Sequence, residues 1–334
     1  MKQTVKEKRI IKEINQLVPS VTINSARKGN VNEVNQAHFF IPTDNKNLEH
    51  SEYFYKGRLR FIHFTNLIAI QSIITDRNLR LYNLRNLNDS REYSFTGDLI
   101  TTDADRRKDA KDNFYLLSMC EKSLLTSKDT KEIEFNMWRL YGNNGEGVAI
   151  ELSFDESQPV NWNDYFLSKV LYGASSKTNL KGLNKLQSQL ENSKPQVSVD
   201  LGQIVCFHKS RLFKLEQEVR LLFDHRKIKT VGPTTYSFKN EVTSPIIRTD
   251  ISKSSNRTHT IKYLELPIYH SKFKSISDEA KIPIPKIEKI ILGYQFKDNF
   301  ETVANHLKDL CNKQLGYVPK IEKSRLTKWY HDSQ

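Results

Sequence analysis

The sequence contains few cysteines and no long apolar run. Its three cysteines, Cys120, Cys206 and Cys311, lie far apart, and neither a CxxC pair nor a cysteine–histidine spacing typical of zinc sites occurs. We therefore expect neither a disulfide framework nor a bound metal, and unpaired cysteines are typical of a reducing cytoplasm. The segment LIAIQSII, residues 67–74, is among the longest apolar runs and is too short to cross a bilayer.

A secretory leader and the common catalytic signatures are also missing. The N-terminal segment MKQTVKEKRI has basic residues but lacks the apolar core of a signal peptide, so we expect a cytoplasmic protein that makes no membrane contact. No GxGxxG or GxxxxGK[ST] loop, HExxH pair or GxSxG turn occurs. The segment VAIELSF, residues 148–154, carries a carboxylate without the lysine of many metal-dependent nucleases, which disfavours that class.

Positive charge is in clear surplus. The 334 residues include 52 lysines and arginines against 39 acidic residues, a formal net charge of +13. Such a surplus favours contact with RNA or DNA, and we expect Arg77, Arg80, Arg85 and Arg91 to provide it. Two alternatives stay open: the charge only keeps the surface soluble, or it meets an acidic, antitoxin-like protein.

The chain is expected to fold as an N-terminal arm followed by one main domain. Residues 5–18 have the apolar spacing of an amphipathic helix that Pro19 ends, so we interpret residues 1–57 as a helical arm and linker. Residues 58–334 form the main domain, and the polar, helix-prone segment 175–200 is a candidate insertion within it.

The main domain reads as many short strands with few helices between them. Alternating apolar residues predict strands, and helical spacing after the capping residue Asn66 and around two later segments predicts helices. The predicted strands cover residues 58–65, 78–84, 114–122, 148–154, 202–209, 286–294 and 317–326, and the predicted helices cover 66–77, 133–141 and 300–316. This order predicts an α+β fold with a split, mostly antiparallel mixed sheet, because a doubly wound parallel sheet needs a helix after each strand.

One stretch, KSRLFKLEQEVRLLFD at residues 209–224, combines strand-like alternation with buried charge. As a strand it would place three charged side chains, Glu216, Glu218 and Arg220, on one face and three apolar ones, Leu215, Val219 and Leu221, in the core. Carboxylates rarely enter so apolar a strand unless they are paired or used. The stretch is either an edge strand whose ion pair faces water or a rigid Glu-x-Glu at the wall of a cleft.

Other polar residues interrupt apolar segments. His63 lies within the strand-like RFIHFT, where a histidine is more often structural than functional. Trp138 and Tyr141 are three residues apart on a predicted helix, so they form either a core stripe or the wall of a binding site. Asn88, Asp89 and Glu92 form a polar turn with two carboxylates, which is also ordinary turn chemistry.

Three of these segments together resemble a widespread bacterial family without an assigned activity. They are NLNDSREYSF at 86–95, FNMWRLYGNNGEGVAIEL at 135–152 and KLEQEVR at 214–220, and the C-terminal IEKIILGY, helix and KIEKSRL agree with it. The resemblance covers residues 58–326 and leaves out the arm. The layout of that family is in turn similar to the ADP-ribosyltransferase fold, in which an early strand holds NAD and a later strand carries a Glu-x-Glu.

The resemblance to ADP-ribosyltransferases implies roles for individual residues. His63 would hold the adenosine-side ribose of NAD, Glu218 would be the catalytic glutamate and Glu216 would orient the acceptor. The NAD contacts implied are His63, Thr65, Tyr82, Ser118, Trp138, Tyr141 and Arg220, with Asn88, Asp89 and Glu92 on the acceptor side. NAD would be a substrate, and no metal is needed.

The sequence therefore leads to three functional hypotheses. The first is NAD-dependent ADP-ribosyl transfer, in a toxin or anti-phage effector that acts on nucleic acid. The second is a non-catalytic nucleic-acid-binding or interaction module, in which Glu216, Glu218 and Arg220 form a structural ion-pair network. The third is an NAD glycohydrolase that uses the same site with water as the acceptor.

Overall fold

The protein is described here by a computed structural model. It describes residues 5–17, 26–28, 37–40, 49–86, 112–154, 159–162, 164–173, 182, 185–186, 188–189, 197–200, 206–225, 236–238, 241–243, 246–254, 257–271 and 282–332. The helices are α1 (Val5–Leu17), α3 (Leu67–Asp76), α6 (Ser123–Thr126), α7 (Lys131–Tyr141), α11 (Phe300–Leu315) and α12 (Leu326–Asp332). A 3₁₀-helix, η5 (Arg211–Glu216), precedes one of the central strands.

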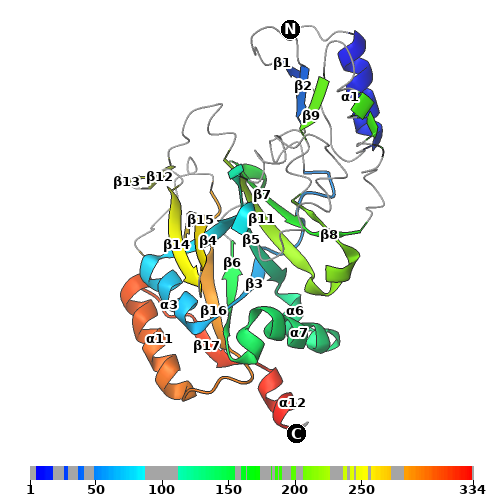
Figure 1. Ribbon diagram of the computed structural model, residues 1–334. Helices are drawn as coiled ribbons and strands as arrows, with labels where there is room; N and C mark the ends of the chain where they lie inside the picture. The colour runs from blue at the N-terminus through cyan, green and yellow to red at the C-terminus, as the bar shows by residue number, and fades with distance from the viewer. Residues whose placement is uncertain are drawn as a thin grey trace.

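A ten-stranded sheet forms the centre of the described chain (Figure 1). Eight strands follow one another in the order β14-β15-β4-β5-β3-β6-β16-β17, and β11 joins β5 to β7. Their bounds are β3 (Arg60–Thr65), β4 (Asn78–Asn83), β5 (Phe114–Glu121), β6 (Val148–Ser153), β7 (Tyr165–Lys169), β11 (Glu218–Asp224), β14 (Ile246–Ser254), β15 (Arg257–Pro267), β16 (Lys286–Leu292) and β17 (Lys320–Lys323). Only the pairing of β16 with β17 is parallel within this sheet, so the predicted mixed, mostly antiparallel α+β fold is confirmed.

The sheet divides at β5, which pairs with three strands. Along one edge, β5 pairs first with β4, through Tyr115 and Leu116, and then with β3, through Cys120 and Glu121. The other edge holds β11 along its whole length. Residues 117–119 therefore face a gap between β4 and β3, at which the ladder is interrupted.

Helices cover both faces of the sheet, and the faces differ in which side chains they present. On the first face, α3 and α11 lie side by side (Figure 1). They pack Ile70, Ile74, Leu307 and Leu315 into the larger core. On the second face, α7 packs against β3, β5 and β6, with Met137 and Trp138 over Ile62, Cys120 and Ala149. Strand alternation sends neighbouring residues to opposite cores, which is why both apolar sets are found in the same strands.

The helix ends carry the capping chemistry expected from the sequence. The side chain of Asn66 accepts a hydrogen bond from the Ala69 amide at 2.8 Å and begins α3. Asn299 caps α11 in the same way, and Gly316 ends it with a φ of 71°, which a residue with a side chain rarely adopts. The predicted helices at 66–77, 133–141 and 300–316 are confirmed within one or two residues.

The N-terminal segment and the candidate insertion contribute to the same small sheet. β2 (Ala37–Phe40) pairs antiparallel with β1 (Ala26–Lys28) and parallel with β9 (Val197–Asp200), away from the main sheet (Figure 1). The predicted helix at 5–18 is confirmed as α1, with Ile10 and Ile14 buried. The division of the chain at residue 57 stays a prediction.

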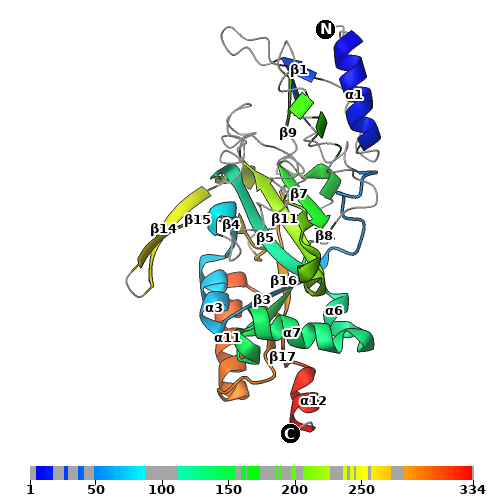
Figure 2. The same cartoon turned by 45° about the vertical axis from the view of Figure 1, so that its right-hand side comes forward.

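Two local expectations from the sequence are wrong. The strand expected across 209–224 begins only at Glu218, because η5 occupies 211–216 and Gln217 turns the chain with a φ of 44°. Leu215, expected in the core, is therefore 57% exposed. The segment 226–260, expected to be loops with short strands, includes β14 and the start of β15, which form a long antiparallel hairpin projecting from the sheet (Figure 2).

A buried ion pair fastens the C-terminal segment to α7. Arg325 donates from Nε to Oε2 of Glu134 at 2.5 Å and from its other nitrogens to the carbonyl oxygens of Ser127 and Leu124. Glu134 is 1% exposed and also accepts from Nε1 of Trp138 at 3.3 Å. Burial raises the pKa of Glu134, and the contacts with Arg325 lower it again in part.

We expect Arg325→Met to lower the free energy of unfolding by about 3 kcal/mol, because it leaves the Glu134 carboxylate buried without its cation. Urea denaturation of the full chain measures this. Combining the change with Glu134→Gln removes the unpaired charge and should recover part of the loss. Equal stability of Arg325→Met and the unchanged protein would contradict this account of the contact.

Candidate functional site

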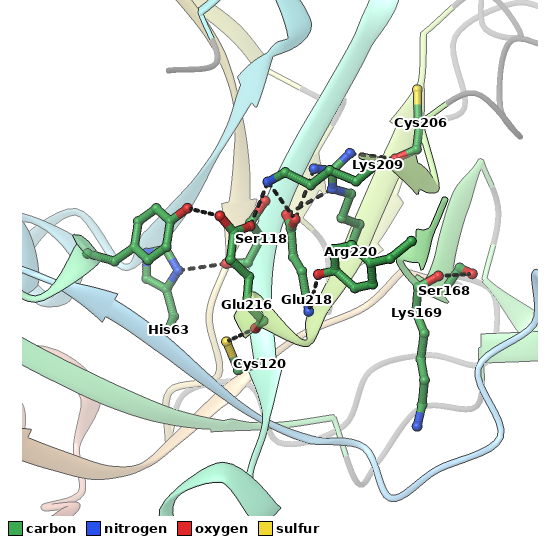
Figure 3. Close-up of polar contacts among 12 residues, drawn as sticks. His63, Ser118, Cys120, Ser168, Lys169, Cys206, Lys209, Glu216, Glu218 and Arg220 are labelled. Carbon is green, nitrogen blue, oxygen red and sulfur yellow. Dashed lines mark hydrogen bonds and ion pairs between the residues drawn. The ribbon is translucent and has the colours of Figure 1, made fainter. Parts of the chain in front are cut away.

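Charged side chains from β10 (His208–Lys209), η5 and β11 meet in one buried cluster (Figure 3). Lys209 lies between two carboxylates, with Nζ 2.6 Å from Oε2 of Glu216 and 3.3 Å from Oε2 of Glu218. Arg220 contacts Glu218 from its other side. These four side chains, Lys209, Glu216, Glu218 and Arg220, are called the Lys209 cluster below, and each is at least nine-tenths buried.

The guanidinium of Arg220 holds Glu218 within a single strand. The two residues are two apart on β11, so their side chains leave the same face, and Nε and Nη2 donate to Oε1 and Oε2 at 2.8 and 2.9 Å. A third donor, Nη1, reaches the carbonyl oxygen of Cys206 at 2.7 Å. Burial raises the pKa of Glu218, and the charge of Lys209 and a hydrogen bond from Ser118 lower it in part.

Lys209 supplies the positive charge opposite Glu216. Burial alone would lower the pKa of Lys209, but the charge of Glu218 and the bond to Glu216 outweigh it and the pKa lies above its ordinary value. Oε1 of Glu216 accepts from the hydroxyl of Tyr141 at 2.7 Å. Tyr141 is 38% exposed, so it connects the buried cluster with the surface.

Tyr141 is positioned by the glycine-rich turn that follows it. The turn after α7 lies against the end of β16, where the Gly293 amide donates to the Gly147 carbonyl at 2.9 Å and the Gln295 amide to the Gly145 carbonyl at 2.8 Å. A Cβ atom on Gly293 would lie 2.1 Å from the Gly145 oxygen, so the two backbones can approach only without a side chain there. This contact fixes the end of α7, and with it Tyr141.

Two further side chains surround the carboxylates. The Glu218 amide donates to the hydroxyl of Tyr172 at 2.9 Å, and the thiol of Cys120 donates to the Glu216 carbonyl at 3.3 Å. Burial raises the pKa of both Tyr172 and Cys120, so both stay protonated at neutral pH. They fix the backbone on either side of Gln217, where the chain turns from η5 into β11.

His63 closes the gap in the sheet next to this cluster. It follows Ile62, the last residue of β3 that pairs with β5, and its Nδ1 donates to the carbonyl of Ser118 at 3.0 Å. The imidazole thus takes the place of a strand partner for Ser118. Burial lowers the pKa of His63, so the neutral ring carries its proton on Nδ1.

The structure brings together six of the residues singled out in the sequence. Ser118 is exposed, pairs across the ladder with Arg220 and hydrogen-bonds Glu218, while its carbonyl receives His63. Through these contacts His63, Ser118, Tyr141, Glu216, Glu218 and Arg220 form one continuous polar site.

The other predicted site residues lie at various distances from it. Tyr82 pairs with Leu116, two residues along β5 from Ser118, and is 39% exposed, so it borders the site. Thr65 pairs with Val148 at the far end of β3. Trp138 is fully buried against Phe64, as the core-stripe interpretation has it. Asn88, Asp89 and Glu92 lie outside the described residues.

Sequence reasoning missed Lys209, the residue that joins the two glutamates. It was assigned to the end of an ordinary strand at 202–209, whereas within the described residues only β10 (His208–Lys209) is extended there. The available signal was a charged residue directly after the apolar run IVCFH. Only the fold, which returns the chain through η5, shows that this charge faces Glu216 and Glu218.

The arginines expected to bind nucleic acid already have partners. Arg80 pairs with Asp250 at 3.1 Å and lies 4.2 Å over the ring of Tyr263. Arg85 pairs with Asp112, and Arg77 donates to the side chain of Gln314 at 3.2 Å. Arg91 lies outside the described residues. The guanidinium groups that the sequence analysis expected to bind nucleic acid beside the site are thus already engaged in contacts within the protein.

His208, next to Lys209, is buried as a neutral ring. Its Nε2 lies 3.0 Å from the hydroxyl of Tyr53, and its Nδ1 has no hydrogen-bond partner among the described residues. Burial lowers the pKa of His208 from 6.5 to about 4. Between these pH values the unfolded chain binds a proton that the folded protein does not.

We therefore expect stability to be lost as the pH falls from 6.5 towards 4, by about 3 kcal/mol from His208 in total. Urea denaturation across this pH range measures the change. His208→Gln cannot titrate, so its free energy of unfolding should depend less on pH over the same range. The same pH dependence in both proteins would show that His208 is not the group responsible.

Among the described residues, no helix is both long and apolar enough to span a membrane. In the same part of the chain, no three histidine, cysteine, aspartate or glutamate side chains gather closely enough to hold a metal ion.

Residues 137–221 match a family described as protein of unknown function (DUF2971). The matched stretch begins in α7 and ends in β11, so it contains Tyr141 and the whole Lys209 cluster but neither His63 nor Ser118. The match agrees with the resemblance to a family without an assigned activity. No curated protein and no solved structure matches the chain.

Proposed function

We propose that the protein is an NAD-dependent ADP-ribosyltransferase whose reacting centre is the polar site between His63 and Tyr141. The observation that carries the proposal is that residues from four separate segments, expected from the resemblance to act together, lie in one hydrogen-bonded group around Ser118. Cytoplasmic location belongs to the same proposal and is supported by three free cysteines.

The side chains present fit a ribosyl substrate chemically. Carboxylates accept from sugar hydroxyls, and the half-exposed ring of Tyr141 offers a face on which a nicotinamide ring can stack. Neutral His63 uses Nδ1 for Ser118, which leaves Nε2 as an acceptor for a ribose hydroxyl. In the transfer, the bond between ribose and nicotinamide breaks, nicotinamide keeps the electron pair, and a nucleophile of the acceptor bonds to the ribose carbon and releases its proton.

The geometry favours Glu216 over Glu218 as the carboxylate that stabilises the reacting ribose. Positive charge develops on the ribose as the bond breaks, as in glycoside hydrolysis, and a nearby carboxylate stabilises it. Both oxygens of Glu218 are occupied by Arg220, and Lys209 adds a second cation. Among the described residues, the carboxylate of Glu216 contacts one cation, Lys209, and the hydroxyl of the partly exposed Tyr141. We therefore assign Glu218 to the framework that orients Lys209 and Glu216.

Glu216→Gln should reduce nicotinamide release from NAD by about a hundredfold, because it removes the charge but keeps the shape. The change should leave the circular dichroism spectrum unaltered and abolish any growth arrest that expression causes. The full chain is incubated with labelled NAD together with RNA, DNA and protein. Label on any of these identifies the acceptor, whereas nicotinamide release without labelling indicates the glycohydrolase. Unchanged turnover by the folded variant would remove Glu216 from the reaction.

His63→Ala should weaken NAD binding by at least tenfold, because the imidazole offers a neutral acceptor at the gap in the sheet. Calorimetric titration measures the affinity. Lys308→Ala, an exposed change on α11, is the control and should bind NAD as the unchanged protein does. Equal affinity of His63→Ala and the control would leave His63 with only its structural contact to Ser118.

A second candidate is a non-catalytic binding module, and one observation favours it. The Lys209 cluster contains two cations and two carboxylates in close contact, so the buried charges already neutralise each other. Such a network can simply hold η5 and β11 in place. On this account the unchanged protein does not cleave NAD, and Glu216→Gln alters only its stability.

A further inference from the structure

The second face of the sheet carries a separate charged surface that α7 does not cover. Five cations and three carboxylates form it, and we call it the basic face: Arg60, Lys122, Lys286, Lys289 and Lys320, with Glu151, Glu288 and Glu322. Lys122 and Lys289 lie 2.5 and 3.9 Å from Glu151, and Lys289 and Lys320 lie 2.8 and 2.7 Å from Glu322. The set has a surplus of two positive charges.

The strand register places these residues in two rows on one face. Opposite residues in a ladder share a face, and Ser153 of β6 has Arg60 on one side and Lys286 on the other. Two residues along β6, Glu151 lies opposite Lys289, which in turn lies opposite Lys320. The strands are about 4.8 Å apart and the rows about 7 Å apart, so the cations form a close array on a flat surface.

Most cations of the basic face are more exposed to solvent than the carboxylates that they contact. Lys122 is 33% exposed, whereas its partner Glu151 is 3% exposed. Lys320 is 69% exposed and Glu322 30% exposed, and Lys286 is likewise more exposed than Glu288. The ammonium groups of Lys122, Lys289 and Lys320 each contact a carboxylate, and Lys320 is the most exposed cation of the set. Lys289 is the exception, since it is less exposed than Glu322, so the positive charge reaches solvent mainly at Arg60, Lys286 and Lys320.

The chemistry of the basic face indicates what it can bind. Lysines as point charges suit phosphate groups. The ring of Tyr317 lies 5.7 Å from Nζ of Lys286 and its hydroxyl accepts from the Ile287 amide, so this ring is held against β16 and is not offered to an unpaired base. Contacts made by such a surface would go to the sugar–phosphate backbone and carry no sequence information.

We propose that the basic face binds the phosphate backbone of double-stranded nucleic acid without reading its sequence. The binding needs no NAD and does not depend on the transferase activity proposed above. Each phosphate that a lysine neutralises releases counterions. The logarithm of the affinity therefore falls linearly with the logarithm of the salt concentration, and the slope is proportional to the number of phosphate contacts.

The test is fluorescence anisotropy of a short labelled DNA duplex titrated with the full chain at several salt concentrations. Lys286→Glu combined with Lys320→Glu should weaken binding at least tenfold and reduce the slope of log affinity against log salt by about two. The control combines Lys308→Glu with Lys313→Glu on α11, on the opposite face of the sheet, and makes the same change in net charge. It should bind as the unchanged protein does.

Four outcomes would overturn the proposal. An equal loss in both double variants would mean that net charge alone acts, and a wild-type affinity that does not change with salt would exclude phosphate contacts. Displacement of the duplex by polyglutamate as readily as by unlabelled duplex would indicate an acidic protein partner. If the labelled single strand binds the protein as tightly as the duplex does, the surface does not select double-stranded nucleic acid.

If circular dichroism shows that the reversed variant is unfolded, Lys286→Gln with Lys320→Gln replaces it. The slope of log affinity against log salt should then fall by about two.

Discussion

The pairing of Arg220 with Glu218 is the contact on which the arrangement of the site depends. Because the two residues lie on one face of one strand, the guanidinium takes both carboxylate oxygens and still has a donor for the Cys206 carbonyl. That last bond holds the turn at Cys206, which leads directly into β10 with His208 and Lys209. Lys209 then holds Glu216 and the end of η5, and Glu216 holds Tyr141 at the end of α7. Three other segments of the chain, residues 206–209, η5 and the end of α7, are thus positioned from one strand.

Such a network is stable only as a whole. Each buried charge costs several kcal/mol to remove from water, and the cost is offset only while its partner is in place. The two cations and two carboxylates balance, so loss of one member leaves another buried and unpaired. The fixed positions of these charges also favour catalysis, because charges held in place need no reorganisation when charge develops on a substrate beside them. Structural and catalytic interpretations therefore describe the same contacts, and only turnover separates them.

Local sequence signals predicted the elements well but not the contacts between them. The alternation in RFIHFT, FYLLSMC and VAIELSF and the asparagine caps predicted strands and helices that the structure contains. The position of Leu215 was wrong because Gln217 adopts a left-handed conformation, which interrupts the alternation without a glycine to mark it. The β14–β15 hairpin was missed because its serines, threonines and lysines are typical of loops. Lys209 depends on segments that meet only in the folded chain.

The three-fold pairing of β5 also has a consequence for how the chain folds. β5 contacts β3 and β4 from before it in the sequence and β11 from about a hundred residues after it. To pair residues that are distant in the sequence, the chain must first close a large loop. The entropy lost on closing it is not offset until the contacts form, which slows folding. Before β11 pairs with it, β5 exposes one edge, on which apolar residues have backbone amides and carbonyls without strand partners. During synthesis that edge is available to any other extended segment, so this central strand is a point at which the nascent chain is open to aggregation.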